Sequence, residues 1–138
     1  MKKKICNILL LVLLFWFFLD MVGLNIGGKV LVSRAYMDDG IFFIIYFLIL
    51  LLYFYKNKIG YFFLISWLFL WFVTQFFSHW YYTIIGSTEK MSYFSETIKL
   101  FQSAEIYIAD IYHIILHILI LFSFVCLICK YPKMIKSK

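Results

Sequence analysis

The chain has 138 residues, of which 65% are hydrophobic, 23% aromatic and 14% charged. Soluble domains carry about 45 to 50% apolar and about 25% charged residues, and so short a chain has too little interior to bury the excess. The composition therefore excludes a soluble domain. It predicts an all-α integral membrane protein, a bundle of four transmembrane helices that forms a single membrane domain over residues 1–138.

Four apolar runs are long enough, at about 20 residues each, to cross the hydrocarbon layer. We expect the first run to remain uncleaved, because no small-residue cleavage site follows it. Asp20 lies near its end and is expected to reach water. Two aspartates before the second run, Asp38 and Asp39, are expected to stabilise a helix N-terminus, with ligation of a cation as the less favoured alternative. The predicted spans are residues 5–22, 41–55, 59–85 and 106–129.

The second span and the second outer loop carry periodic patterns. Asp39, Tyr46 and Tyr53 recur every seven residues, which either aims two hydroxyls inward or places interfacial tyrosines on one face. In the loop, apolar residues from Met91 to Phe101 recur at helical spacing and predict a short amphipathic interfacial helix. Gly86 is expected to end the third span, and Ser103 to cap the fourth.

The charges are distributed unevenly along the chain. Nine lysines lie next to span ends on one side of the predicted bundle, whereas the other four basic residues and all seven acidic residues lie on the other side. By the positive-inside rule, both termini are cytoplasmic and the protein is a multi-pass protein of a bacterial cytoplasmic (plasma) membrane. The basic residues are expected to contact lipid headgroups, and nucleic acid is not an expected partner.

The three cysteines, Cys6, Cys126 and Cys129, lie near the predicted cytoplasmic side. Because that compartment is reducing, we expect no structural disulfide. Cys126 and Cys129 have the C-x-x-C spacing of redox and metal sites, but no Gly, Pro or Trp flanks them. The sequence favours small, lipid-compatible side chains at these positions.

Ionisable residues inside apolar spans indicate the candidate site, because apolar residues would pack at lower cost. Asp110, His113 and His117 fall within an arc of roughly 60° on one face of the fourth span, at about 100° per residue. The third span has polar side chains on one side at a similar depth. They include the predicted pocket residues Gln75, Ser78, His79 and Tyr82.

Four interpretations of this pocket remain open. The polar groups fix helix register through hydrogen bonds. They hold a divalent transition metal such as zinc, with His113 and His117 as ligands and Asp110 or His79 completing the site. They hold b-type haem between His79 and a histidine of the fourth span. They catalyse a reaction of a lipid or lipid-linked substrate through a metal-bound water or a His/Asp general base.

We expect a small binding or accessory protein, for example an immunity or partner-stabilising protein, with the pocket opening outward between spans three and four. The alternative is a metal-dependent membrane enzyme acting on a lipid or lipid-linked substrate at the outer leaflet. The sequence leaves open whether the chain is an enzyme, and it identifies no catalytic residue. Membrane lipids, another membrane protein or a second copy in a homodimer are the expected partners.

Overall fold

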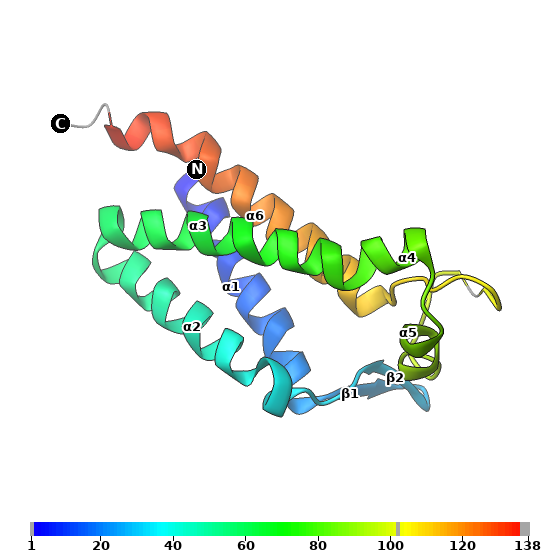
Figure 1. Ribbon diagram of the computed structural model, residues 1–138. Helices are drawn as coiled ribbons and strands as arrows, with labels where there is room; N and C mark the ends of the chain where they lie inside the picture. Colours follow the sequence, from blue (N-terminus) through cyan, green and yellow to red (C-terminus); the bar gives the residue numbers. More distant parts are fainter. Residues whose placement is uncertain (1, 102, 136–138) are drawn as a thin grey trace.

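The computed structural model describes residues 2–101 and 103–135. Its long helices are α1 (Lys2–Val22), α2 (Tyr36–Tyr55), α3 (Asn57–Gln75) and α6 (Ile111–Ile135). A π-helical turn, η1 (Phe76–Trp80), and then α4 (Tyr81–Ile85) continue α3 (Figure 1). Four segments are long and apolar enough to cross a membrane, namely Lys4–Val22, Tyr36–Tyr55, Lys58–Ile85 and Ile111–Cys129. The prediction of a helical bundle with four candidate membrane spans is confirmed.

The helices are arranged as a ring in which α1 packs against α2 and α6, and α3 packs against the same two helices. Both ends of the described chain lie at one end of this bundle, which we call the basic end (Figure 1). The loops of the other end form what we call the hairpin end. Leucine and isoleucine side chains fill the centre of the bundle and are fully buried: Leu10, Leu13, Leu64, Leu68 and Ile120.

Helices α2 and α3 form a V that is closed at the basic end. Lys56 separates them, and its backbone N–H bonds to the Leu52 carbonyl at 2.7 Å. Gly60, at the start of α3, is buried against the backbone of Leu52 and Tyr53, and any side chain there would overlap that backbone. From this contact the two helices diverge towards the hairpin end (Figure 1). A single glycine therefore permits the closest approach of the two helices.

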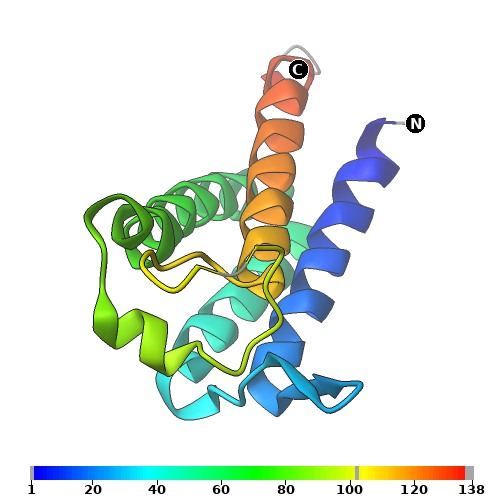
Figure 2. The same cartoon turned by 90° about the vertical axis from the view of Figure 1, so that its right-hand side faces the viewer.

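The hairpin end is built from two connected loops (Figure 2). In the first loop, β1 (Leu24–Ile26) pairs antiparallel with β2 (Lys29–Val32) around Gly27 and Gly28, whose φ angles are 57° and 79°. Such a turn needs positive φ at both positions, which glycine adopts without strain. The second loop contains α5 (Thr88–Tyr93), with the Ser87 hydroxyl accepting a hydrogen bond from the Lys90 N–H at 3.2 Å.

The second loop connects the hairpin to the start of α6. The Ile98 N–H bonds to the Val30 carbonyl, and the Ile111 N–H bonds to the Ile98 carbonyl, both at 2.9 Å. Since Ile98 pairs with β2, it lies outside the amphipathic helix predicted there, and α5 ends at Tyr93. The predicted helix was therefore too long, and the sequence analysis did not anticipate the hairpin.

The structure corrects two span boundaries. The second span begins at Tyr36 instead of residue 41, and the fourth begins at Ile111 instead of residue 106. Ser103 does not cap the fourth span, since its hydroxyl accepts bonds from the N–H groups of Glu105 and Ile106 in a local turn. Gly86 ends the third span as predicted, with φ of 79° and its N–H bonded to the Tyr82 carbonyl at 3.0 Å.

The expectation of no disulfide was wrong. Cys6 of α1 and Cys126 of α6 are joined by a disulfide where these neighbouring helices face each other, with their Cα atoms 5.7 Å apart. Cys6 is only 1% exposed, so the packed interior shields this bond from reductants in water. Cys129 is free and exposed. The two cysteines of the C-x-x-C sequence therefore differ, since Cys126 is in the disulfide and Cys129 is not.

Candidate functional site

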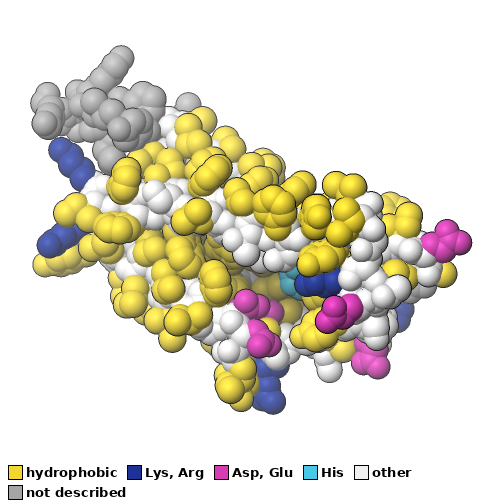
Figure 3. Space-filling model, viewed as in Figure 1, with side chains coloured by type: hydrophobic (Ala, Val, Ile, Leu, Met, Phe, Trp, Pro, Cys, Tyr) yellow, Lys and Arg dark blue, Asp and Glu magenta, His cyan; other side chains and the backbone are white. Residues whose placement is uncertain are grey.

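A cavity of about 250 Å³ lies at the hairpin end of the bundle, among α1, α2, α3, η1, α5 and α6. The space-filling view shows a hollow between the diverging ends of α2 and α3, where acidic, histidine and lysine side chains gather in a mainly hydrophobic surface (Figure 3). Its polar lining residues are Asp20, Asp39, Thr74, Gln75, Ser78, His79, Lys90, Tyr112 and His113. Aromatic side chains complete the wall: Phe17, Phe42, Trp71 and Phe94.

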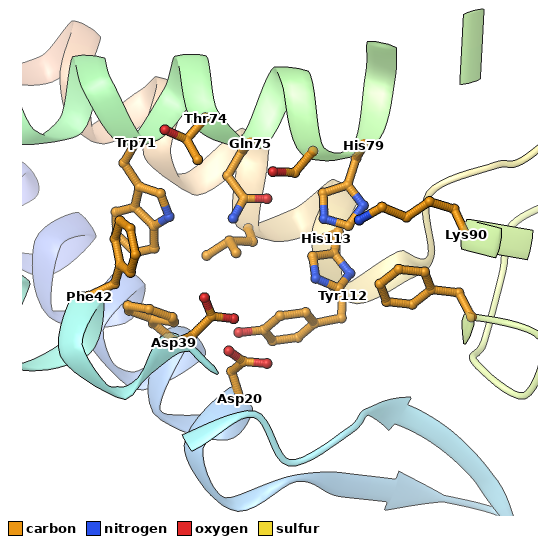
Figure 4. Close-up of a pocket in the computed structure, with 14 residues that line it drawn as sticks. Asp20, Asp39, Phe42, Trp71, Thr74, Gln75, His79, Lys90, Tyr112 and His113 are labelled. Atoms are coloured by element: carbon orange, nitrogen blue, oxygen red, sulfur yellow. The ribbon is translucent and has the colours of Figure 1, made fainter. Parts of the chain in front are cut away.

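Two carboxyl groups meet on one side of the cavity. Asp20 from the end of α1 and Asp39 from the first turn of α2 both line it and lie next to each other (Figure 4). Asp20 is 5% exposed, so the expectation that it reaches water was wrong. Neither carboxylate forms a salt bridge with a described basic side chain. The salt bridge found among the described residues joins Asp110 to His113.

A pair of imidazoles lies across the cavity from the carboxyl groups. The ring centroids of His79, from η1, and His113, from the first turn of α6, are 4.0 Å apart and their planes are inclined by 32°. Each ring is held from outside the cavity by a different partner. The predicted meeting of spans three and four at these two histidines is therefore present in the structure.

Asp110 orients His113 and begins α6. Its Oδ1 accepts a hydrogen bond from the His113 backbone N–H at 2.9 Å, as an N-cap residue does, and another from the His113 Nδ1 at 2.8 Å. Asp110 thus precedes the helix and does not project from its face as predicted. The Nδ1 bond fixes the tautomer of a neutral His113, so that Nε2 is an acceptor.

Tyr107 orients His79. Its hydroxyl lies 2.6 Å from His79 Nδ1, and the ring is fully buried in the extended segment before α6. Burial, with a smaller contribution from the charge of Asp110, raises the pKa of Tyr107, so the hydroxyl stays protonated at neutral pH. With this hydroxyl as donor, His79 Nδ1 is the acceptor and Nε2 carries the proton. The two imidazoles therefore offer one donor and one acceptor.

The π-helical turn redirects the end of the third span. The Tyr81 N–H bonds to the Phe76 carbonyl, five residues before it. An additional residue in one turn rotates all later positions by about 100° relative to a regular helix. His79 consequently lines the cavity with Gln75 and Ser78, whereas Tyr82 does not. Tyr82 instead contacts the Lys90 ammonium group, 5.4 Å from its ring centroid.

His117 lies apart from the other two histidines. Its Nδ1 accepts a hydrogen bond from Trp80 Nε1 at 3.2 Å, and its ring meets the edge of Phe72. It is absent from the cavity lining. Among the described residues, no three His, Cys, Asp or Glu side chains are arranged to hold a metal ion. The predicted zinc set of His79, Asp110, His113 and His117 is thus not assembled as one cluster, and metal or haem binding stays a prediction.

Comparisons with protein-family models, curated protein sequences and solved structures find no match to this chain. The site must therefore be interpreted from its own geometry.

One buried acceptor in the cavity lacks a partner. Gln75 Oε1 is buried and receives no hydrogen bond from the described residues. The Gln75 side chain extends from α3 into the cavity, on the wall opposite the carboxyl pair (Figure 4). Because an unpaired buried carbonyl oxygen costs about 1 to 3 kcal/mol, a donor supplied by a ligand would stabilise this arrangement.

Four further residues line the cavity and were not predicted as site residues: Asp20, Asp39, Lys90 and Tyr112. A signal was present for Asp20, because an ionisable residue within an apolar span is itself a candidate functional residue. Asp39 shared a helical face with Tyr46 and Tyr53, and the hydroxyls of both tyrosines do point inward, to the Leu10 carbonyl and the Asn7 side chain. That face marked the interior side of α2.

Proposed function

We propose that this chain is a small membrane binding protein whose hairpin-end cavity takes a ligand with a positively charged nitrogen. The observation that carries the proposal is the pair of carboxyl groups, Asp20 and Asp39, which line the cavity without a basic partner among the described side chains. A cation between the two groups would remove the repulsion between two charged carboxylates.

The rest of the cavity supports such a ligand. Trp71 and Phe17 form a wall in which their ring centroids are 4.6 Å apart, and Phe42 and Tyr112 add further aromatic surface. Aromatic faces attract cations through their quadrupoles, most strongly where water is displaced. The volume of about 250 Å³ is that of a site for a small molecule or for one polar group of a larger molecule.

The orientation in the membrane is part of this proposal. The positive-inside rule assigns the basic end to the cytoplasm, so the cavity receives its ligand from the outer side. The immunity or partner-stabilising function predicted from the sequence stays a prediction, since it depends on a protein partner.

Ethanolamine, a soluble primary amine, is a suitable probe for the proposal. We expect it to raise the melting temperature of the detergent-purified protein in a saturable manner, whereas ethylene glycol, which lacks the amine, should not. The double variant Asp20→Asn/Asp39→Asn should lose at least about tenfold in apparent affinity, because it replaces the charged acceptors by neutral groups.

Asp38→Asn is the matched control. Asp38 lies beside Asp39 in the first turn of α2 but is exposed and does not line the cavity, so this variant should respond to ethanolamine as the wild type does. Circular dichroism and gel filtration establish that each variant is folded. An equal response of the wild type and the double variant would show that the amine binds elsewhere and would refute the proposal.

A second function is favoured by the bond between Asp110 and His113. A carboxylate that orients an imidazole is the arrangement of a general base, and His113 faces the cavity. Under this alternative the protein transforms its ligand at the outer leaflet. Incubation of ligand with wild type and with His113→Gln, followed by mass analysis, separates the two functions. Only an enzyme would change the ligand's mass, and only with His113 present.

A further inference from the structure

The cavity is open towards the side of the bundle. In the view across the helices, the hollow lies between the diverging ends of α2 and α3, on the same face as their hydrophobic side chains (Figure 3). Phe42 on α2, which lines the cavity, is exposed by 38%, and Phe76, the first residue of η1, is exposed by 39%. In a bilayer such side chains face lipid. A ligand can therefore enter from the membrane while its apolar part stays in the lipid.

The charges are ordered along the cavity. Asp20 and Asp39 lie at one end, and Lys90 reaches from α5 towards the histidines at the other end (Figure 4). The Lys90 Nζ is 5.7 Å from the centroid of the Phe94 ring, and no described acidic side chain pairs with it. This order, negative and then positive, complements a ligand with an ammonium group at its tip and a phosphate behind it.

The acceptors select the kind of ammonium group. Asp20 and Asp39 place oxygen atoms on one wall of the cavity, and Gln75 lies on the opposite wall, on α3 (Figure 4). Gln75 Oε1 has no partner among the described residues. A primary ammonium group has three N–H donors to satisfy such acceptors. A quaternary ammonium group has none and would leave the Gln75 oxygen unpaired.

We infer that the cavity binds the phosphoethanolamine headgroup of an aminophospholipid that enters between α2 and α3. The primary ammonium group bonds to Asp20, Asp39 and Gln75, and the phosphate meets Lys90 and the Nε2–H of His79. The acyl chains remain in the outer leaflet. This inference rests on the proposed function, since it names the ligand of the same site.

Native mass spectrometry of the full chain, titrated with lipids of equal acyl composition, tests the inference. We expect phosphatidylethanolamine to bind at least about tenfold more tightly than phosphatidylcholine or phosphatidylglycerol. Lys90→Gln should weaken phosphatidylethanolamine binding by about tenfold, because a charge-assisted bond to phosphate is lost. Lys29→Gln, at an exposed lysine of β2 outside the cavity, should change neither phosphatidylethanolamine binding nor the ethanolamine response.

The outcomes separate the inference from the proposed function. Equal binding of the three lipids, or no effect of Lys90→Gln on phosphatidylethanolamine, would overturn the inference. Binding of soluble O-phosphoethanolamine without binding of the lipid would overturn the membrane origin of the ligand while the proposed function stands. If neither ethanolamine nor phosphatidylethanolamine binds, both are overturned.

Discussion

Replacing Gly60 by alanine is expected to lower the free energy of unfolding by about 3 kcal/mol or more, the upper part of the range for overpacked cores. The added methyl group would overlap the backbone of Tyr53 and Leu52. Because backbone atoms cannot rotate aside as a side chain does, α2 and α3 must separate at the closed end of the V. The measurement is the melting temperature of the purified variant.

Gly40→Ala is the control for this substitution. Gly40 lies within α2, and a methyl group there would have no neighbour within 4 Å. Alanine is favoured over glycine in a helix interior by about 1 kcal/mol, so we expect unchanged or slightly higher stability. If both variants had the melting temperature of the wild type, Gly60 would not be the contact that closes the V.

Cys6→Ser is expected to lower the melting temperature strongly under non-reducing conditions. The disulfide joins residues 120 positions apart in the sequence, and a chain-entropy estimate for loops of this size is about 4 to 5 kcal/mol in water. In detergent the helices of the unfolded chain stay in the micelle, so the unfolded state has less conformational entropy than in water. The value is therefore an upper bound on the stabilisation by the disulfide. A reductant that reaches the bond should reproduce the effect in the wild type.

The free cysteine supplies the control. Cys129 is exposed and unbonded, so Cys129→Ser should melt as the wild type does. Maleimide labelling of the denatured, unreduced wild type should modify one thiol per chain, and labelling after reduction should modify all three cysteines. Three reactive thiols without reduction would contradict the bond between α1 and α6.

Hydrophobicity predicted the four candidate membrane spans, because length and apolarity alone decide whether a helix can cross a membrane. It predicted the helix ends less well. Residues 106–109 are mostly apolar, yet they are not helical, because Tyr107 packs on His79 and Asp110 caps the helix. Contacts with residues far along the chain decided this boundary, and periodicity within one segment does not record them.

The candidate site was predicted in part for the same reason. Gln75, Ser78, His79 and His113 line the cavity because spans three and four pack side by side. Tyr82 does not line the cavity, since the π-helical turn rotates it away. His117 does not line it either, since its ring is hydrogen-bonded to Trp80. A π-helical turn has no reliable sequence pattern.

The acidic half of the cavity comes from α1 and α2, whose loop-end residues the sequence analysis assigned to water and to helix capping. The acidic half of the cavity could be predicted only with the knowledge that the four helices form a ring. Asp20 lies in the last turn of α1 and Asp39 in the first turn of α2, and the hairpin between the two helices brings the two carboxyl groups together.

Site-specific photo-crosslinking in native membranes tests most directly whether the cavity between α2 and α3 is a ligand site. p-Benzoyl-phenylalanine replaces Thr74, which lines the cavity, and in a second variant replaces Phe63, an exposed residue of α3 outside it. We predict one dominant adduct at Thr74, of an amine-bearing molecule, that disappears with Asp20→Asn/Asp39→Asn. The same mixture of adducts at both positions, unchanged by that double substitution, would contradict the account.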